Sequence, residues 1–385
     1  MPAFNFQKWN KIIGWSVFAI ALITYWLTVE PTVSFWDAGE YITTASNLEV
    51  GHPPGAPLYQ ILGAFFSIFA IGQANVALTI NLMSVFASAF TILFLFWSLS
   101  LLLRQLSTDS ESISTERGVK IIGSAAIGAL AFTFTDSFWF SAVEAEVYAA
   151  AACIMSILFY CGLRWQADMF HPRGNRWLVL IAFIVGLSFG IHFMGLLTIP
   201  AIGFLYFFKK TPVVTPKNFI VANVVVVAVL LFIFKLLLPW TLKFFSAMEL
   251  FFVNNLRLPF NSGTAFSALL FIGLFYYGLK ITRAKGQVWA NTVLLCVLFI
   301  FIGFSSWLML PIRANAGTVI NENNPNNARE LLAYYNREQY PETHLFYGPQ
   351  FTEIYAGLDP DNPYKDDKPK YEKDPAQGKY IVVNE

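Results

Sequence analysis

Charged residues are scarce in this chain of 385 residues, where Asp, Glu, Lys and Arg make up only 13%, against about 25% in a typical soluble domain. The 25 basic and 24 acidic residues nearly balance, which excludes the strongly basic surface of a nucleic-acid-binding protein. A hydrophobic share of 56% excludes a disordered chain. Because so little polar surface cannot cover an ordinary soluble fold, the composition indicates an integral membrane protein.

The sequence also lacks several catalytic signatures. Its three cysteines, Cys153, Cys161 and Cys296, lie inside apolar runs without zinc or redox spacing. It has no Gly-rich phosphate loop and no nucleophile elbow. These absences exclude a P-loop ATPase and an elbow-type serine hydrolase, and they favour interpreting the cysteines as small apolar residues of the interior.

Apolar runs recur at lengths that can cross a bilayer, which takes about 20 helical residues. The first run follows two lysines but lacks a small-residue cleavage pattern, so we expect an uncleaved helix rather than a signal peptide. The runs predict an all-α polytopic bundle with a GT-C-like arrangement of about nine transmembrane helices. They cover residues 12–30, 75–103, 120–137, 146–164, 177–191, 194–208, 218–239, 263–280 and 287–310.

The distribution of basic residues predicts the orientation. With the N-terminus in the cytoplasm, nine spans place fourteen Lys and Arg residues inside and only Lys243 and Arg257 outside before the last span. If 177–208 formed one span, or if 56–72 crossed the membrane, every later loop would move to the opposite side of the membrane. We therefore expect 56–72 to be an outer interfacial or re-entrant helix. The inner residues are Lys8, Lys11, Arg104, Arg117, Lys120, Arg164, Arg173, Arg176, Lys209, Lys210, Lys217, Lys280, Arg283 and Lys285.

Composition changes near residue 313. We predict a transmembrane domain over 1–312, with an outer loop at 31–74, and an extracytoplasmic extension over 313–385 that could be the start of a longer domain. The extension is rich in Asn, Pro, Tyr and acidic residues. Its apolar spacing predicts a helix over 327–337, and its Pro, Asp and Lys content predicts irregular structure over 359–376.

Polar residues that a membrane should exclude gather at the predicted outer face. A charge at membrane depth costs about 2.5–3.5 kcal/mol and indicates a functional site. The residues are Glu30, Asp37, Glu40, Glu49, His52, Asp136, Glu144, Glu146, Tyr148, His192, Lys235, Glu249 and Arg313.

The first outer loop is the densest of these clusters. Asp37, Glu40, Tyr41 and Thr44 have the spacing that places side chains on one helix face. A Gly-His-Pro-Pro-Gly turn containing His52 follows and ends any helix. As alternatives, the serine three residues before Asp37 forms a capping-box pattern in which Asp37 only caps the helix, and His52 could serve only the turn.

A second cluster precedes the fourth span. Ser141 and Glu144 again have capping-box spacing, so Glu144 could be a helix cap. Glu144 and Tyr148 lie one turn apart and could act together. Glu146 lies on another face, where we expect no capping role.

Two further side chains stand alone. His192 lies in the outer turn between the two short spans, where a single histidine is often structural. Arg313 follows the last span; it could be an interfacial anchor or a bidentate ligand of a phosphate.

Carboxylates, histidines and an arginine at one membrane face suit one reaction. A carboxylate can accept the proton of an acceptor hydroxyl, and a cation can stabilise a departing phosphate. A sugar linked by phosphate to a membrane lipid would arrive at this depth. Three or more carboxylates could also hold a divalent metal.

Three motifs carry a family resemblance: Phe-Trp-Asp-Ala-Gly-Glu-Tyr at 35–41, Gly-His-Pro-Pro-Gly-Ala-Pro at 51–57 and Leu-Pro-Ile-Arg-Ala at 310–314. Over residues 10–325 the chain resembles the GT-C membrane glycosyltransferases, and most closely the Bacteroidota proteins related to animal protein O-mannosyltransferases. The resemblance implies a polyprenyl-phosphate-linked sugar donor and a Ser/Thr acceptor in an exported protein. It also implies a site that faces the periplasm from the bacterial inner membrane. It assigns the catalytic base to an acidic residue of the first loop, either Asp37 or its competitor Glu40.

We therefore predict an inverting-type transferase in which Asp37 is the base and Glu40 supports it. The predicted donor-phosphate ligands are Arg313, His192 and His52, and the predicted lining of the sugar or acceptor pocket is Glu144, Glu146 and Tyr148. One alternative is a transporter or flippase for a lipid-linked or small polar substrate, which Lys235 within a span would favour. Another is a non-catalytic assembly subunit. Polar residues gathered at one face favour the enzyme.

Overall fold

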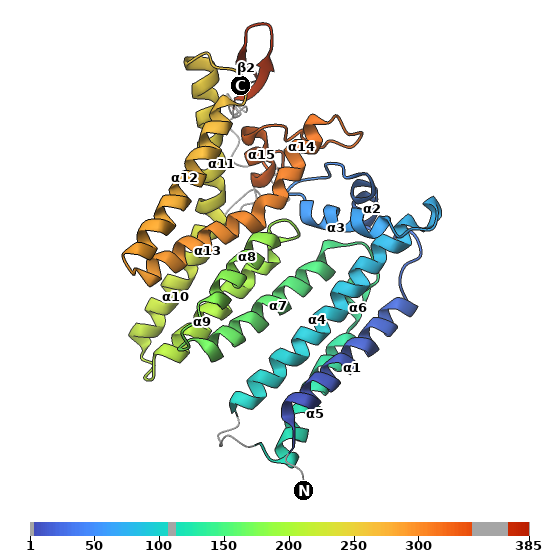
Figure 1. The fold of residues 1–385 in the computed structure, drawn as a ribbon. Helices are drawn as coiled ribbons and strands as arrows, with labels where there is room; N and C mark the ends of the chain where they lie inside the picture. The colour runs from blue at the N-terminus through green and yellow to red at the C-terminus, as the bar shows by residue number, and fades with distance from the viewer. Residues whose placement is uncertain (1–3, 107–112, 341–368, 385) are drawn as a thin grey trace, which may run out of the picture.

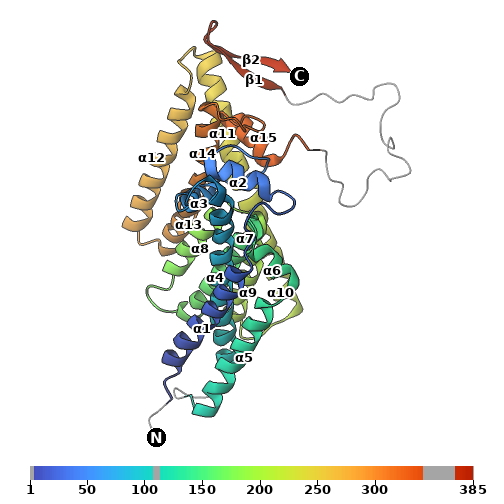
Figure 2. The ribbon, with the colours of Figure 1, turned by 90° about the vertical axis from the view of Figure 1, so that its right-hand side faces the viewer.

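The computed structural model describes residues 4–106, 113–340 and 369–384. The chain is an all-α polytopic membrane protein, in which long helices run side by side and short helices gather at one end (Figures 1 and 2). The helices are α1 (Phe6–Leu27), α2 (Ala38–Asn47), α3 (Pro57–Ser67), α4 (Val76–Leu106), α5 (Thr115–Thr133), α6 (Asp136–Ala142), α7 (Val147–Asp168), α8 (Arg176–Ser188), α9 (Thr198–Lys210), α10 (Pro216–Leu231), α11 (Leu238–Leu250), α12 (Ser262–Ala284), α13 (Val288–Phe304), α14 (Met309–Asn315) and α15 (Ala328–Asn336). An antiparallel hairpin of β1 (Lys370–Asp374) and β2 (Lys379–Asn384) follows.

Each of the nine predicted spans coincides with helix. Within the described residues, seven helical stretches are long and apolar enough to cross a membrane, and the pair α5–α6, bent by 70°, is an eighth candidate. The remaining predicted span, 177–191, corresponds to α8, a shorter apolar helix. Helices α10 and α11 belong to one stretch of 40 residues, Pro216–Asn255, much longer than the predicted 218–239. At about 1.5 Å per residue it measures about 60 Å, so its end extends well beyond a hydrocarbon core of about 30 Å.

Helix α3 occupies the segment that we expected not to cross. It has 11 residues and is therefore about 16 Å long, too short for a bilayer. Its first N–H groups, from Leu58 and Tyr59, donate to the carbonyl of Gly190 at 2.7 and 3.1 Å. This contact holds the outer loop against the turn that follows α8.

Small residues allow the closest helix packing. A Cβ at Gly186 of α8 would overlap the backbone of Ile300 and Gly303 in α13, so only glycine permits this approach. The main core cluster continues into the C-terminal part of the chain, where Tyr334 and Tyr335 of α15 are 1% and 5% exposed. Residues after 313 therefore share the core of the transmembrane helices.

Helix α15 confirms the helix predicted over 327–337. The Asn327 side chain accepts hydrogen bonds from the N–H groups of Arg329 and Glu330 at the first turn, and Arg337 ends the helix with φ 58°. These are the expected features of a well-capped helix.

The prediction of irregular structure over 359–376 is wrong for Lys370–Asp374, which forms β1. Residues 375 and 376 lie in the hairpin turn, and residues 359–368 lie outside the described part of the chain. The polar composition of β1 is typical of a loop, but tertiary contacts hold the hairpin in place. The Tyr380 N–H donates to the Asn254 side chain at 2.8 Å, and the Tyr380 hydroxyl lies 3.1 Å from the Glu249 carboxylate.

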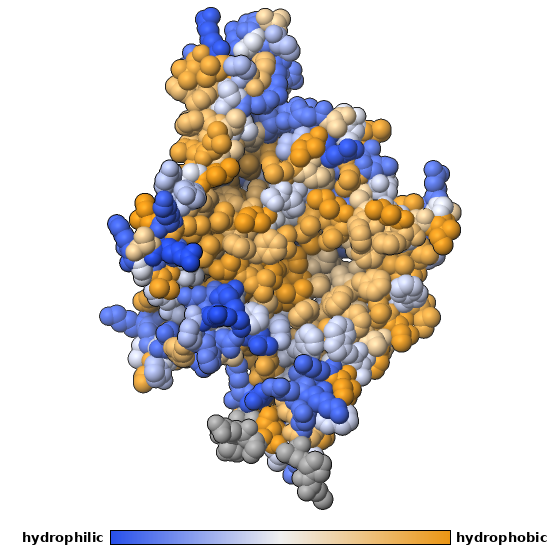
Figure 3. Space-filling model, in the orientation of Figure 1, coloured by the Kyte–Doolittle hydropathy of each residue, from blue (hydrophilic) through white to orange (hydrophobic). Residues whose placement is uncertain are grey.

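The surface fits a membrane protein. An apolar band crosses the molecule, and hydrophilic surface lies along the lower-left edge and at the upper end (Figure 3). In Figure 1 the connections α7–α8, α9–α10 and α12–α13 reach this lower-left edge, whereas α2, α3, α14 and α15 lie at the opposite side. The short outer-loop helices and the C-terminal helices are thus close neighbours.

Candidate active site

Asp37 directly precedes α2, and its carboxylate is not used to cap that helix. It is the N-cap residue of the helix, yet its side chain makes no capping hydrogen bond, and the side chain is 58% exposed. The Ser34 hydroxyl donates instead to the Glu144 carboxylate at 2.6 Å. Ser34 and Asp37 therefore do not form the capping box that was the alternative role for Asp37.

Glu40 holds His52 with both of its carboxylate oxygens. The backbone N–H of His52 donates to the Glu40 Oε1 at 2.6 Å, and the ring Nδ1 of His52 lies 2.9 Å from the Glu40 Oε2. Gly51 permits this approach, because a Cβ there would lie 2.6 Å from the Glu40 Oε1. The other ring nitrogen of His52, Nε2, is 3.8 Å from the Asp37 carboxylate. One imidazole therefore lies between the two acidic residues of the first loop.

The electrostatics of the Glu40–His52 pair favour a charge on both side chains. The hydrogen bond to Glu40 raises the pKa of His52, and burial opposes it only partly. Burial would raise the pKa of Glu40, but the hydrogen bonds and the charge of His52 outweigh it, so this pKa is lowered. Glu40 is thus engaged as an anion, and Asp37 is the carboxylate left available to a substrate.

Glu40→Gln should destabilise the protein in a limited pH window. The pair stabilises the fold above the ordinary Glu pKa of 4.5 and below the ordinary His pKa of 6.5. Its contribution disappears as the pH rises through the folded-state pKa of His52, or falls through that of Glu40. We expect a loss of about 1–2 kcal/mol near pH 5.5 that shrinks by pH 8, measured by thermal unfolding in detergent.

Glu116→Gln is the matched control, because the Glu116 pair with Lys120 lies on the surface, with side chains 77% and 72% exposed. It should change the unfolding free energy little at any pH. A pH-independent difference between wild type and Glu40→Gln would contradict the ion pair.

A cavity of about 450 Å³ brings together six of the eight predicted site residues. Its walls come from α2, the 52–55 turn, the start of α7, the turn after α8 and the end of α15. The residues are Asp37, Glu40, Tyr41, His52, Pro53, Pro54, Gly55, Glu146, Val147, Tyr148, Phe189, Ile191, His192, Phe193, Arg337 and Tyr340.

Glu146 is the most buried of the predicted acidic residues in this cavity, at 5% exposure. It is the N-cap residue of α7, and its carboxylate accepts from the Val147 N–H at 3.3 Å. The expectation that it has no capping role is therefore wrong. Burial and the nearby charge of Asp37 raise the pKa of Glu146 to about 7. Near neutral pH, Glu146 can therefore carry a proton beside Asp37.

Glu144 and Arg313 lie outside the cavity. Glu144 is 4% exposed and binds Ser34, and it precedes α7 rather than sharing a helix turn with Tyr148. The Arg313 guanidinium donates to the backbone carbonyls of Leu48 and Asn47 at 2.5 and 3.2 Å. Arg313 therefore satisfies the C-terminal end of α2 and supports the loop that carries Asp37.

The histidine after α8 does reach the cavity. His192 caps the short helix Phe193–Leu197 by accepting from the Met194 N–H at 3.1 Å, and its ring lies 5.5 Å from that of Tyr148. Burial lowers the pKa of His192. The second cavity histidine is therefore mainly neutral near pH 7, whereas the pKa of His52 is shifted in the opposite direction.

Sequence reasoning missed Arg337 and Tyr340. They come from the C-terminal extension, and the Arg337 guanidinium lies 4.7 Å from the centre of the Tyr340 ring. The sequence did offer one signal for Arg337, because it is a basic residue at the end of the helix predicted over 327–337. Nothing in the local pattern indicates that this helix packs over the first loop. The Tyr334 hydroxyl makes that connection by donating to the Gly51 carbonyl at 2.5 Å.

Within residues 4–106, 113–340 and 369–384, no group of three His, Cys, Asp or Glu side chains is arranged to hold a metal ion. The carboxylates of the first loop are instead engaged by His52 or separated from one another.

Lys235, the residue that favoured a transporter, lies near the middle of the helical stretch Pro216–Asn255. It is about twenty residues beyond Pro216, a distance of about 30 Å, which is close to the full thickness of the hydrocarbon core. Its ammonium lies 4.7 Å from the centre of the Phe234 ring.

Comparison with known proteins gives matches in the same region. Residues 37–215 match the family model of the protein O-mannosyl-transferase TMEM260 N-terminal domain. This part of the chain is similar to the TMEM260 protein O-mannosyl-transferases. The match begins at Asp37 and includes the cavity residues of α2, α7 and the turn after α8, whereas Arg337 and Tyr340 lie beyond it. Residues 341–385 match a family of unknown function, DUF8416.

Two curated relatives support this relationship. The chain is 28% identical over 148 residues to the protein O-mannosyl-transferase tmem260 of Dictyostelium discoideum, covering 38% of this chain and 16% of the relative. It is 27% identical over 177 residues to the protein O-mannosyl-transferase TMEM260 of Mus musculus, covering 45% of this chain and 22% of the relative. The matches thus span less than a quarter of either relative. No solved structure matches the chain.

Proposed function

We propose that the chain is a membrane glycosyltransferase that moves a sugar from a polyprenyl-phosphate donor to a Ser or Thr hydroxyl of an exported protein. The proposed site faces the periplasm from the bacterial inner membrane, with the N-terminus in the cytoplasm. The observation that carries the proposal is the cavity, in which the uncapped Asp37 carboxylate lies 3.8 Å from His52. The relationship to protein O-mannosyl-transferases supports the choice of a protein acceptor.

In the proposed reaction Asp37 accepts the proton of the acceptor hydroxyl. The hydroxyl oxygen then forms a bond to the anomeric carbon, and the bond from that carbon to the phosphate oxygen breaks. Glu40 is a positioning residue, because its two hydrogen bonds fix His52 beside Asp37. General-base catalysis of this kind typically contributes about 10²–10⁴-fold to the rate.

Arg337 is the proposed ligand of the donor phosphate, because it is the arginine that lines the cavity. A guanidinium can form two parallel hydrogen bonds to a phosphate and stabilise the charge that develops as it leaves. Protonated His52 adds a second positive charge, with the raised pKa to support it. Glu146 and Tyr148, on the opposite wall, are placed to bind sugar or acceptor hydroxyls.

A transfer assay in sealed vesicles tests the activity and its sidedness together. The full chain is reconstituted with polyprenyl-phosphate mannose, and a threonine peptide that cannot cross membranes is added outside. We expect mannosyl peptide only when the end of the protein that carries α2 and α15 faces the medium. No product in either orientation, with donor and acceptor in excess, would contradict the proposed function. Product only in the opposite orientation would place the site at the other end of the protein.

A further inference from the structure

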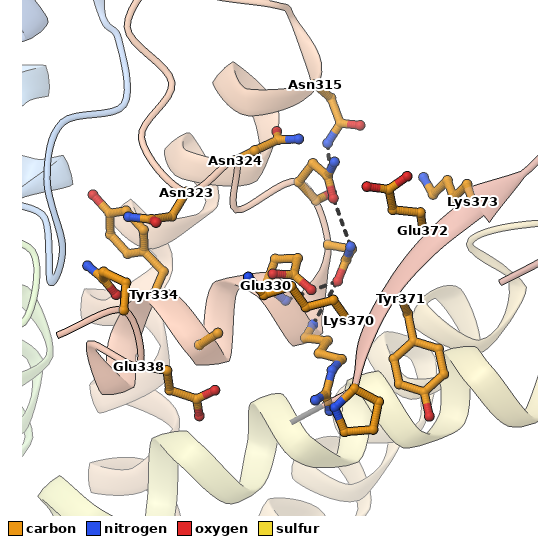
Figure 4. A pocket seen from close by; sticks show the side chains of 16 residues that line it. Asn315, Asn323, Asn324, Glu330, Tyr334, Glu338, Lys370, Tyr371, Glu372 and Lys373 are labelled. Atoms are coloured by element: carbon orange, nitrogen blue, oxygen red, sulfur yellow. Dashed lines mark hydrogen bonds between the residues drawn. The ribbon is translucent and has the colours of Figure 1, made fainter. Parts of the chain in front are cut away.

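A second cavity, of about 600 Å³, lies on the other side of α15 from the first loop. Its walls are α15, the asparagine-rich segment before it and β1 of the C-terminal hairpin (Figure 4). Three acidic and three basic side chains contribute equally to its charge, which favours a neutral, polar ligand. The lining residues are Asn315, Asn323, Asn324, Asn326, Asn327, Arg329, Glu330, Ala333, Tyr334, Glu338, Gln339, Pro369, Lys370, Tyr371, Glu372 and Lys373.

Strand β1 meets this cavity with its edge rather than with a face. Successive side chains of a strand point to opposite faces of the sheet, so a cavity above one face would be lined by alternate residues. Here four consecutive residues, Lys370 to Lys373, line it. The backbone edge of β1 must therefore point into the cavity, with α15 opposite (Figure 4).

That edge has backbone groups to offer. Within residues 4–106, 113–340 and 369–384, strand β1 pairs with β2 and with no other strand, so alternate N–H and C=O groups point away from β2. Among the described residues, no backbone–backbone hydrogen bond other than those to β2 involves Lys370–Asp374. An edge strand of this kind is a template for an added strand.

The two cavities adjoin at the C-terminal end of α15, where Arg337 and Tyr340 line the first and the intervening Glu338 and Gln339 line the second. Tyr334 lines the second cavity, and Arg337, three residues later, lines the first. One helix is about 10 Å thick, and an extended chain advances about 3.3 Å per residue. A strand in the second cavity could therefore place a residue three or four positions away beside Asp37.

We propose that the second cavity binds the acceptor polypeptide as an extended strand that pairs with the free edge of β1. This inference rests on the proposed function for the identity of the ligand as an acceptor. Backbone pairing with β1 provides affinity with little dependence on sequence. Asparagine side chains, among them Asn315, Asn323 and Asn324 in Figure 4, line the same cavity.

Scanning backbone N-methylation along a peptide tests the pairing directly. The probe is a fluorescein-labelled, alanine-rich peptide of about nine residues with one threonine, about 30 Å long when extended. Each methyl group removes one N–H donor. We expect the Kd, measured by anisotropy with the full chain, to rise about two- to tenfold at alternate positions and to change little at the positions between them. A flat profile, or equal sensitivity at every position, would overturn the proposal.

Two proline variants locate the binding edge. Adjacent N–H groups of β1 point in opposite directions, so either Tyr371→Pro or Glu372→Pro removes a donor from the free edge while the other disturbs pairing with β2. The free-edge variant should bind the unmethylated peptide more weakly and unfold at the same temperature as wild type. Wild-type Kd values in both variants would place the peptide elsewhere.

Failure of the proposed function would look different. Binding is measured without donor, so the Kd does not depend on sugar transfer. Alternating N-methyl sensitivity without any sugar transfer would retain the peptide site and reject the transferase. Transfer with a flat N-methyl profile would retain the transferase and reject pairing with β1.

Discussion

Asp37→Asn should lower the rate of sugar transfer by about 10²–10⁴-fold, the usual cost of losing a general base, and leave thermal unfolding unchanged. Asparagine keeps the size of the side chain and removes only the ability to take the acceptor proton. Stability should be retained because the Asp37 side chain makes no capping hydrogen bond and is 58% exposed. Single-turnover transfer from polyprenyl-phosphate mannose to a threonine peptide measures the effect.

Asp136→Asn is the matched control for Asp37→Asn. Asp136 is an exposed residue in the first turn of α6 and does not line the cavity, so its substitution should leave the rate unchanged. If Glu40→Gln were inactive and Asp37→Asn active, the roles of the two first-loop residues would be reversed. An inactive Glu146→Gln beside an active Asp37→Asn would move the base to Glu146. Normal transfer by all three variants would refute the site.

Arg337→Ala should raise the KM for the lipid-phosphate donor about 30- to 1,000-fold, corresponding to about 2–4 kcal/mol for a lost charge-assisted contact. The KM for the acceptor peptide should change much less. The protein should remain folded, because Arg337 lies at the end of α15 and its guanidinium contacts the Tyr340 ring. Initial rates at varied donor concentration provide the measurement.

Arg313→Ala provides the contrast to Arg337→Ala. It removes the hydrogen bonds to the Leu48 and Asn47 carbonyls and should cost about 1–3 kcal/mol of stability. Its donor KM should remain near the wild-type value in the fraction that stays folded. If Arg313→Ala raised the donor KM and Arg337→Ala did not, the phosphate would bind at the end of the last span, as the sequence motif suggests.

Features that depend on local sequence could be predicted well. An apolar run of about 20 residues must satisfy its backbone within the membrane by forming a helix, and each of the nine predicted spans is helical. The Asn327 cap and the apolar spacing that follows it likewise predicted α15. The clustering of Asp37, Glu40 and Tyr41 followed from helix periodicity, and all three line the same cavity.

Contacts between distant segments could not be predicted in this way. Arg313 and Arg337 are both basic residues at the ends of helical segments, and only the packing of α15 over the 51–55 turn decides which one reaches the cavity. The free edge of β1 likewise depends on the docking of Tyr380 against α11. The sequence alone determined the membrane class, the helices and the acidic first loop, because these depend on composition and short-range periodicity. The tertiary structure decided that Arg337 rather than Arg313 lines the cavity, that Ser34 binds Glu144, and that the edge of β1 faces the second cavity. These features depend on contacts across more than a hundred residues, which leave no local pattern in the sequence.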